Sequence, residues 1–477
     1  MSQCVPASNI NTNLEMYGGK WGGAIPLIVL IIGLLWLSLT GPATPKNFWS
    51  VGFLAIVGGL LCARSKSEYC KTVLRGMGDQ AGGTIIASWI FASVLAQVVQ
   101  HGGLIEGLLW FGLNTGAQGS IFTSITFVSA ICFSMGTGTA NGTILAFTPV
   151  MYPAGVFLGA DPLMLALAIM SGGAVGDTLS PISASNIVSA ITVGADMKAI
   201  TRTRAPLVFI AAAIALVIFL VMGGGGNVSA PPQFRSMEPT GLLMLLGFVA
   251  VIGFSLLGKA LIESLCYGIF VALAIGIGIG KLDLSQMLHV VQKQGASSGL
   301  IEDGVNGVVG AIIFILFVLG IVRVLIESGI MEEIVNWAQR SFIKSRRQAE
   351  LAILTVTHLV TIPVSANTPC EVLLGPTFVK PIAERFGIAP ERAANLLCCS
   401  VCTLFYMMPW HIVCALWYNT VTQTAAQYDI ASPSITGAFA LPFNWALFFV
   451  IYISAITGWG SQKVSIPDTT DVQHEPQ

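Results

Sequence analysis

Long apolar runs separated by short polar segments dominate this chain. Runs such as residues 24–39 and 206–222 come close to the length that an α-helix needs to cross a hydrocarbon core about 30 Å thick. The pattern predicts an all-α polytopic membrane protein. Candidate spans lie near residues 23–40, 48–65, 83–101, 118–137, 139–158, 162–180 and 206–224, and then near 239–257, 260–280, 304–326, 349–367, 369–383, 392–410 and 440–460.

Glycine, proline and asparagine interrupt the runs near residues 139, 162 and 369. We therefore expect broken or re-entrant helices and about 11–14 transmembrane spans. A Gly-rich polar segment separates two sets of seven runs. The predicted organisation is a polar cytoplasmic N-terminus (1–22), a first transmembrane repeat (23–224), a linker (225–238), a second transmembrane repeat (239–460) and a polar cytoplasmic tail (461–477).

An internal repeat supports this division. One constant shift along the chain pairs Gly78 with Gly304, Gly103 with Gly329, Glu106 with Glu332, and Ala140-Asn141 with Ala366-Asn367. A second, slightly larger shift pairs Pro153 with Pro381, Gly159 with Gly387, Pro162 with Pro390, and Pro181 with Pro409. Glycine and proline are common helix breakers, so some pairs arise by chance. The four pairs of the second shift, however, lie where each half is most irregular.

Basic residues lie at opposite ends of equivalent runs in the two halves. In the first half they mark residues 64–75 and 196–205 as cytoplasmic loops. In the second half they gather at residues 340–347 and 380–392. The repeat mates of those two segments carry no basic residue and are residues 114–120 and 152–162. The charges predict an inverted repeat, the plan of many secondary transporters, in which the site lies near the midplane between the repeats.

Composition agrees with a membrane carrier and excludes other classes. Of 477 residues, 54% are hydrophobic and 9% charged, against about 25% charged in soluble domains. The net charge of −1 gives no basic field for nucleic acid. The Cys399-x-x-Cys402 pair has no second pair and lies in an apolar run, which disfavours a metal site. No catalytic motif indicates an enzyme, and the asymmetry of the intramembrane acids between halves favours a carrier over a channel.

The first unusual segment at membrane depth is Gly136–Thr143, which holds three glycines. We expect unwound backbone there, with oxygen ligands for a hard cation such as Na⁺. The alternative is a tight helix–helix contact made by small residues. The oxygen-bearing residues of this segment are Thr137, Thr139, Asn141 and Thr143.

The matching segment of the second half is Ser365–Glu371, where Pro369 disfavours helix at the residue before it. Glu371 is an acid among apolar neighbours, and an ionised carboxylate at the bilayer centre costs about 2.5–3.5 kcal/mol or more. It persists if it faces a cavity, binds a cation or carries a proton. The alternative places it near an interface, paired with Lys380 or with a basic residue of a loop. Asn367 and Thr368 complete this set of candidates.

The third segment is Gly172–Ser183, in which Asp177 precedes the helix breaker Pro181. An acid beside several hydroxyls at a break predicts a Na⁺ or proton site, to which Ser180, Ser183 and Asn186 also contribute. We expect Na⁺ ligands at Asp177, Thr139, Asn141 and Asn367. The repeat mate of this segment carries Trp410 and His411. The imidazole could relay a proton or contact an organic solute, or it could be an interfacial residue.

The string Gly176-Asp177-x-x-Ser180-Pro181-x-Ser183, followed by Gly194-x-Asp196 and a basic Arg202 or Arg204, resembles the signature of the NhaC family of Na⁺/H⁺ antiporters, within the wider ion transporter superfamily. The match is close over residues 130–205 and 395–420. The family usually has Ser-Asp-Thr-Thr where this chain has Ser183-Ala184-Ser185-Asn186, so its second acid is missing. It also tends to have Asn where this chain has His411. The resemblance further implies a homodimer.

These departures favour an ion-coupled secondary transporter that moves a small organic solute, a carboxylate or an amino acid, by alternating access. Na⁺ or H⁺ would be the coupling ion, and no other cofactor is expected. The alternative is a Na⁺/H⁺ antiporter with Asp177 as the shared carboxylate. Trp410 and His411 would shape the solute pocket. The expected location is the cytoplasmic (inner) membrane, with lipid around the chain and both termini in the cytoplasm.

Overall fold

The computed structural model describes residues 14–40, 45–181, 183–228, 238–287, 290–291, 296–297, 299–330, 333, 343–364 and 367–460. Most of the predicted N-terminal segment, most of the linker and the tail 461–477 lie outside these residues. So do Ser365 and Ala366 of the second predicted break.

Helices make up nearly all of the described chain. Those of the first half are α1 (Ile25–Thr40), α2 (Pro45–Cys62), α3 (Lys66–Met77), α4 (Gln80–His101), α5 (Leu104–Thr115), α6 (Ser120–Thr137), α7 (Ala140–Phe157), α8 (Pro162–Leu179), α9 (Ala184–Val193) and α10 (Met197–Met222). Those of the second half are α11 (Leu245–Leu256), α12 (Leu261–Gly278), α13 (Leu300–Glu327), α15 (Arg346–Val364), α16 (Asn367–Leu374), α17 (Lys380–Arg385), α18 (Pro390–Leu404), α19 (Ile412–Tyr428) and α20 (Pro442–Thr457).

Strands are few and short. Two antiparallel pairs join β1 (Leu158–Ala160) to β2 (Gly224–Val228) and β3 (Val290–Val291) to β4 (Ala296–Ser297). Strand β2 occupies the start of the segment predicted as a linker. Short 3₁₀ turns cover Gly19–Ala24, Pro239–Met244, Leu284–Gln286 and Ile435–Ala440, and a π turn covers Gly375–Val379.

The prediction of an α-helical membrane protein is confirmed. Within the described residues, seven segments are long and apolar enough to cross a membrane, and three shorter apolar helices accompany them. Helices suit a bilayer because they satisfy every backbone N–H and C=O group internally. One predicted span, 392–410, is wrong at its end: helix α18, which covers most of it, already ends at Leu404. Helix α19 was not predicted, because its Thr, Gln and Asn residues lower its hydropathy.

The two shifts of the sequence repeat recur in the positions of the helices. Helix α6 begins at Ser120 and α15 at Arg346, positions that the first shift pairs. Helices α8 and α9 begin at Pro162 and Ala184, and the second shift pairs these starts with those of α18 at Pro390 and α19 at Ile412. Both α8 and α18 begin with a proline. Its fixed φ suits the first position of a helix, where a backbone N–H would have no intrahelical partner. The exact bounds of the two repeats stay a prediction.

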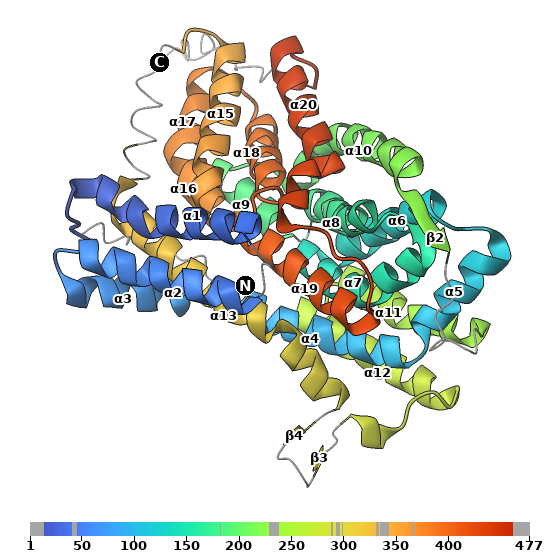
Figure 1. The fold of residues 1–477 in the computed structure, drawn as a ribbon. Helices are drawn as coiled ribbons and strands as arrows, with labels where there is room; N and C mark the ends of the chain where they lie inside the picture. The colour runs from blue at the N-terminus through green and yellow to red at the C-terminus, as the bar shows by residue number, and fades with distance from the viewer. Residues whose placement is uncertain are drawn as a thin grey trace, which may run out of the picture.

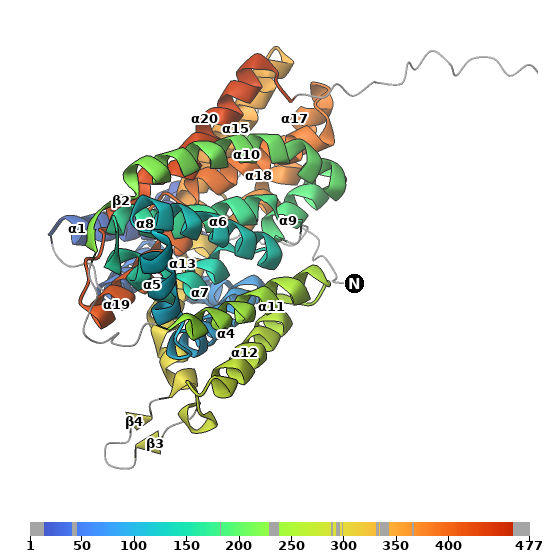
Figure 2. The ribbon, with the colours of Figure 1, turned by 90° about the vertical axis from the view of Figure 1, so that its right-hand side faces the viewer.

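Helices of the two halves pack against one another. Helix α10 packs against α20 and α18, while α9 lies against α16 and α18 (Figures 1 and 2). A second group holds α2, α3 and α4 against α13, with α12 on α4 (Figure 1). The break between α8 and α9 and the start of α16 lie in the first group, where α9 meets α16 and α18.

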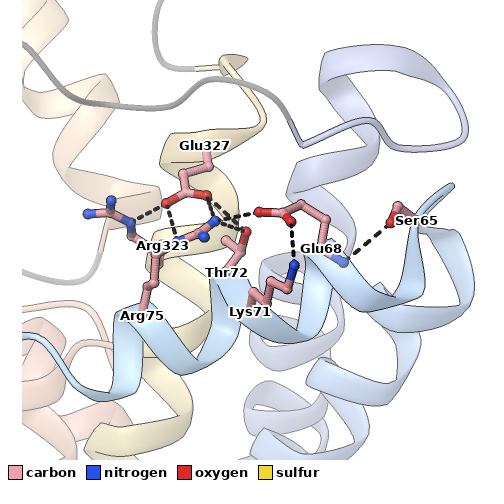
Figure 3. Close-up of polar contacts among 7 residues, drawn as sticks. All are labelled: Ser65, Glu68, Lys71, Thr72, Arg75, Arg323 and Glu327. Carbon is pink, nitrogen blue, oxygen red and sulfur yellow. Dashed lines mark hydrogen bonds and ion pairs between the residues drawn. The ribbon is translucent and has the colours of Figure 1, made fainter.

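A charged cluster joins α3 to the end of α13 in the second group (Figure 3). The Glu327 carboxylate is 1% exposed and accepts hydrogen bonds from Thr72 (2.8 Å), Arg75 (2.6 Å) and Arg323 (2.5 Å). Hydrogen bonds to the Glu327 and Glu68 carboxylates raise the pKa of the Arg75 guanidinium above its usual range. This cluster is internally satisfied, so its contacts are those of a structural link between helices.

Candidate functional site

Asp177 lies in the last turn of α8, just before the break to α9. Its carboxylate is buried, with 6% of the residue exposed. Oδ1 accepts a 2.8 Å hydrogen bond from the Ser183 hydroxyl, and Oδ2 accepts one of 2.6 Å from the Tyr406 hydroxyl. Within the described residues Asp177 has no ion pair. A buried acid held only by hydroxyls is a group that can bind a cation or a proton.

Asn186, in the first turn of α9, stabilises the break itself. Its amide nitrogen donates to the carbonyls of Thr178 (3.0 Å) and Ser180 (2.5 Å), and lies 3.3 Å from that of Asp177. These carbonyls belong to the end of α8, where the helix leaves them without intrahelical partners. Asn186 therefore contributes to the site by holding the C-terminal end of α8 rather than by offering its amide nitrogen to a ligand.

Glu371, on α16, is fully buried beside α9. One carboxylate oxygen accepts a hydrogen bond from the Ser185 hydroxyl, and Oε2 is buried without a partner in the described part of the chain. The alternative of an ion pair with Lys380 is wrong, because Lys380 is exposed and forms none with Glu371. The structure therefore supports the first reading, a buried acid with an oxygen available for a cation or a proton.

Arg204 places a guanidinium among these acids. It lies in α10 and is 1% exposed, so the prediction that residues 196–205 form a cytoplasmic loop is wrong at this position. Nε donates to Asn395 Oδ1 (2.8 Å), and Nη1 donates to the Thr178 carbonyl (3.0 Å) and lies 3.2 Å from Cys398 Sγ. Nη2 has no partner among the described residues.

Cys398 connects the two acidic sides of the site. Its sulfur lies 3.2 Å from Asn186 Oδ1 and 3.5 Å from Ser185 Oγ, the hydroxyl that donates to Glu371. Thus Asp177, Asn186, Cys398, Ser185 and Glu371 form a continuous polar cluster. Their helices come from both halves of the chain.

The predicted set of site residues did not include five residues that the structure places here: Ser185, Arg204, Asn395, Cys398 and Tyr406. Three of them carried a signal. Ser185 is one of the hydroxyl residues that follow Asp177 at the break, Arg204 is an arginine at the start of a long apolar run, and Tyr406 directly follows Phe405, the repeat mate of Asp177. The asparagine and cysteine have no distinguishing pattern in the sequence.

The break at Gly136–Thr143 is narrower than expected. Gly138, with φ of 68°, and the extended Thr139 form it alone, because Thr137 belongs to α6 and Asn141 and Thr143 belong to α7. The Thr137 and Thr143 hydroxyls donate to carbonyls of their own helical turns. Thr139 caps α7, and Asn141 keeps a buried Oδ1 that accepts no hydrogen bond from a described residue.

This first break adjoins the Asp177 helix. A Cβ at Gly173 of α8 would lie 3.3 Å from Ala140 Cα, and the Ser180 hydroxyl donates to the Met135 carbonyl of α6 (2.8 Å). No hydrogen bond joins Asp177 to Thr139, Asn141 or Asn367 in the part of the chain that is described. A shared Na⁺ site made by these four residues therefore stays a prediction.

In the second break, Asn367 and Thr368 bond to each other at the start of α16: the Thr368 backbone N–H donates to Asn367 Oδ1 (2.9 Å). Trp410 and His411 lie in the break between α18 and α19. The Trp410 ring N–H donates a 2.8 Å hydrogen bond to the Ile362 carbonyl. His411 Nε2 lies 3.0 Å from the same carbonyl, and His411 Nδ1 lies 3.0 Å from the Phe405 carbonyl.

His411 is fully buried in the fold, and its position relative to a membrane interface stays a prediction. Its two ring nitrogens are occupied by backbone carbonyls, so His411 and Trp410 tie this break to α15. A contact of either ring with a solute stays a prediction.

The site can therefore do two kinds of chemistry. Asp177 and Glu371 offer carboxylate oxygens, the ligand type that suits Na⁺ and also carries protons, while Arg204 offers a donor to an anion. Among the residues that the structure describes, no group of three His, Cys, Asp or Glu side chains is arranged to hold a metal ion.

Known proteins resemble this chain over most of its length. The Malate-2H⁺/Na⁺-lactate antiporter of Bacillus subtilis (strain 168) is 25% identical over 328 residues, which cover 65% of this chain and 69% of that protein. An uncharacterized Na⁺/H⁺ antiporter of Haemophilus influenzae is 24% identical over 440 residues, or 84% of this chain and 90% of that protein. The solved YdaH transporter of Alcanivorax borkumensis is 14% identical, with a TM-score of 0.41, over 91% of this chain and 99% of that one.

The family comparison settles the class of protein. The sequence pattern of the Na⁺/H⁺ antiporter family matches residues 13–224 and 233–450, nearly the whole of the two predicted repeats. This confirms the resemblance that the Gly176–Ser183 string indicated. The chain is an ion-coupled secondary membrane transporter, and it belongs to the Na⁺/H⁺ antiporter family.

Proposed function

We propose that this protein couples the movement of Na⁺ or H⁺ to the transport of a small carboxylate, by alternating access. The single observation that carries the proposal is Asp177, a buried acid at a helix break whose carboxylate accepts hydrogen bonds, within the described residues, only from the Ser183 and Tyr406 hydroxyls. Burial of an ionised acid in a membrane is costly and marks ion pathways and proton relays.

Glu371 extends the cation site. It lies on the opposite repeat, and its Oε2 is buried and free of described partners. Two acids linked through Asn186, Cys398 and Ser185 allow a cation or proton bound at one to alter the charge felt by the other. Coupling by alternating access requires such a shared site between the repeats.

A carboxylate as the solute rests on two supports. The Bacillus subtilis relative is named as exchanging malate and lactate with coupling cations. In this chain a buried arginine lies within the same cluster as the acids, and guanidinium groups suit carboxylates. An amino acid, which also carries a carboxylate, belongs to the same proposal. No resident cofactor is proposed besides the coupling ion.

The second candidate is plain Na⁺/H⁺ antiport. The family match favours it, and two acids within one buried cluster provide what cation exchange needs. The two candidates differ in whether cations move without an organic solute.

Purified protein in proteoliposomes that contain a pH-sensitive dye would separate the candidates. A Na⁺ gradient is imposed with and without L-malate, L-lactate and a panel of amino acids. We expect a fast pH or Na⁺ response only when a transported solute is present. A full-rate, Na⁺-driven pH change without any solute would establish the antiporter instead.

We also propose that the protein resides in the cytoplasmic membrane with both termini and α3 on the cytoplasmic side. The basic residues of α3 support this orientation. Cys70 is exposed on α3 and serves as a probe. A membrane-impermeant thiol reagent is expected to label Cys70 in inside-out vesicles and not in intact cells, with a Cys70→Ser variant as the control for labelling elsewhere.

A further inference from the structure

Arg204 has a donor that the rest of the site does not use. Its Nε and Nη1 are fixed by Asn395, the Thr178 carbonyl and Cys398, whereas Nη2 is buried and has no partner among the described residues. A buried donor without an acceptor is costly, and a buried charge without a partner is more so. Such a group persists where a ligand supplies the missing acceptor.

The surroundings of Arg204 indicate which ligand. Asp177 and Glu371 lie in the same cluster but form no ion pair with Arg204 in the described chain. Asn395 Oδ1, the Thr178 carbonyl and Cys398 Sγ hold the guanidinium instead, so no carboxylate neutralises its positive charge by direct contact. A guanidinium fixed in this way keeps its charge available to an anion.

Resting on the proposed function, we propose that Arg204 Nη2 binds the carboxylate of the transported solute and thereby selects anions at this site. Asp177 and Glu371 then serve the coupling cation, and Arg204 serves the anion. The cluster places the two charges near each other, since Cys398 contacts Arg204 (3.2 Å) and Ser185 (3.5 Å), and Ser185 donates to Glu371.

The site also explains how solute and cation favour each other. With the acids ionised and Arg204 charged, the cluster carries one excess negative charge and repels a carboxylate. A bound Na⁺ or proton removes that excess. Binding of the cation should therefore strengthen binding of the carboxylate, and by linkage the reverse also holds.

The test uses Arg204→Lys and Arg204→Gln in proteoliposomes, with Arg202→Lys as the matched control because Arg202 is exposed on the same helix. Uptake of labelled L-malate and L-lactate gives the solute KM. Binding of ²²Na⁺ without solute gives the cation affinity. We expect both Arg204 variants to raise the solute KM by about 100-fold. Arg204→Lys keeps the positive charge and should change Na⁺ binding by less than about threefold, whereas Arg204→Gln removes a positive charge beside the acids and should strengthen Na⁺ binding rather than weaken it. Arg202→Lys should match the parent.

Asn395→Asp provides an independent test that keeps the arginine. The new carboxylate faces Nε and pairs with the guanidinium, so it should compete with the solute and raise its KM in a folded protein. An unchanged solute KM in folded Arg204→Lys and in Asn395→Asp would overturn the proposal, as would parallel loss of Na⁺ binding. The parent protein tests the proposed function separately. If it takes up no carboxylate or amino acid under any cation gradient, the proposed function fails, whatever the variants show.

Discussion

The Tyr406 hydroxyl donates a 2.6 Å hydrogen bond to Oδ2 of Asp177, and so links the second repeat directly to the acid of the first. The two residues lie on opposite sides of the repeat boundary. Phe405, the repeat mate of Asp177, immediately precedes Tyr406. Asp177 of the first half is therefore hydrogen-bonded to the residue that follows its apolar counterpart, Phe405, in the second half. The helical scaffold repeats, and the chemistry at its centre does not.

Tyr406→Phe should weaken cation coupling while leaving the fold intact. The hydroxyl stabilises the ionised carboxylate that binds a cation, and a hydrogen bond to a charged group contributes about 1.5–3 kcal/mol. We expect the Na⁺ concentration for half-maximal transport to rise by about 10-fold or more. A cation titration of solute uptake at constant pH measures this. Tyr418→Phe, in α19, is the control, and an equal shift in both variants would contradict a specific role of Tyr406.

Asp177→Asn should abolish ion-coupled transport. The amide keeps the size of the side chain and its contact with Ser183, but it cannot bind and release a proton or balance the charge of Na⁺. Uptake driven by a cation gradient is the measurement, and thermal unfolding in detergent reports the fold. Asp303→Asn, an exposed acid at the start of α13, should transport as the parent does. Full coupled activity of Asp177→Asn would remove Asp177 from the mechanism.

The sequence predicted the parts of this molecule that follow from local chemistry. Apolar length predicted the membrane helices, and Pro181 and Gly138 predicted where helices end. The prediction from Pro369 is wrong, because this proline and the residue before it lie in the first turn of α16, where the N–H that proline lacks would have no intrahelical partner. Pro181 and Gly138 act on the conformation of their own backbone, so their effect can be predicted from the local sequence. The acids Asp177 and Glu371 were found for the same reason, since a charge in an apolar run is visible alone.

The partners of these acids could not be read in this way. Tyr406, Ser185 and Cys398 become site residues only through contacts with positions far away in the chain. His411 has partners that the sequence did not reveal either: the fold places the carbonyls of Phe405 and Ile362 against its two ring nitrogens. Repeat symmetry predicts which helices meet, and not which side chains touch.

Gly176→Ala should separate α6 from α8 at the site. A Cβ at this position would lie 2.3 Å from Ser134 Cβ and 2.5 Å from the Met135 backbone nitrogen, so backbone would have to move. We expect loss of transport and a lower unfolding temperature. Gly83→Ala in α4 meets no atom within 4 Å and should be neutral or slightly stabilising. Equal behaviour of the two variants in transport and melting assays would contradict the close packing at Gly176.

Arg392→Met should destabilise the group of helices around the site. Arg392 Nη2 donates to Glu350 (2.8 Å), and Nη1 donates to Ser454 (2.8 Å), so this residue joins α18 to α15 and α20. Removal of one member of a buried ion pair costs about 3–5 kcal/mol, because the other charge stays buried. Thermal unfolding measures the loss. The double variant Arg392→Met with Glu350→Met should recover much of it, and a double variant as unstable as the sum of both single changes would refute the pairing argument.

The most direct test of ion-coupled carboxylate transport is uphill accumulation. Proteoliposomes receive labelled L-malate or L-lactate at equal concentrations on both sides, together with an inward gradient of Na⁺ or of protons. Coupling through the Asp177 and Glu371 acids predicts that the internal solute concentration rises above the external one and falls back when an ionophore dissipates the gradient. Label that exchanges without ever accumulating, under either gradient, would contradict the coupling of carboxylate movement to these ions.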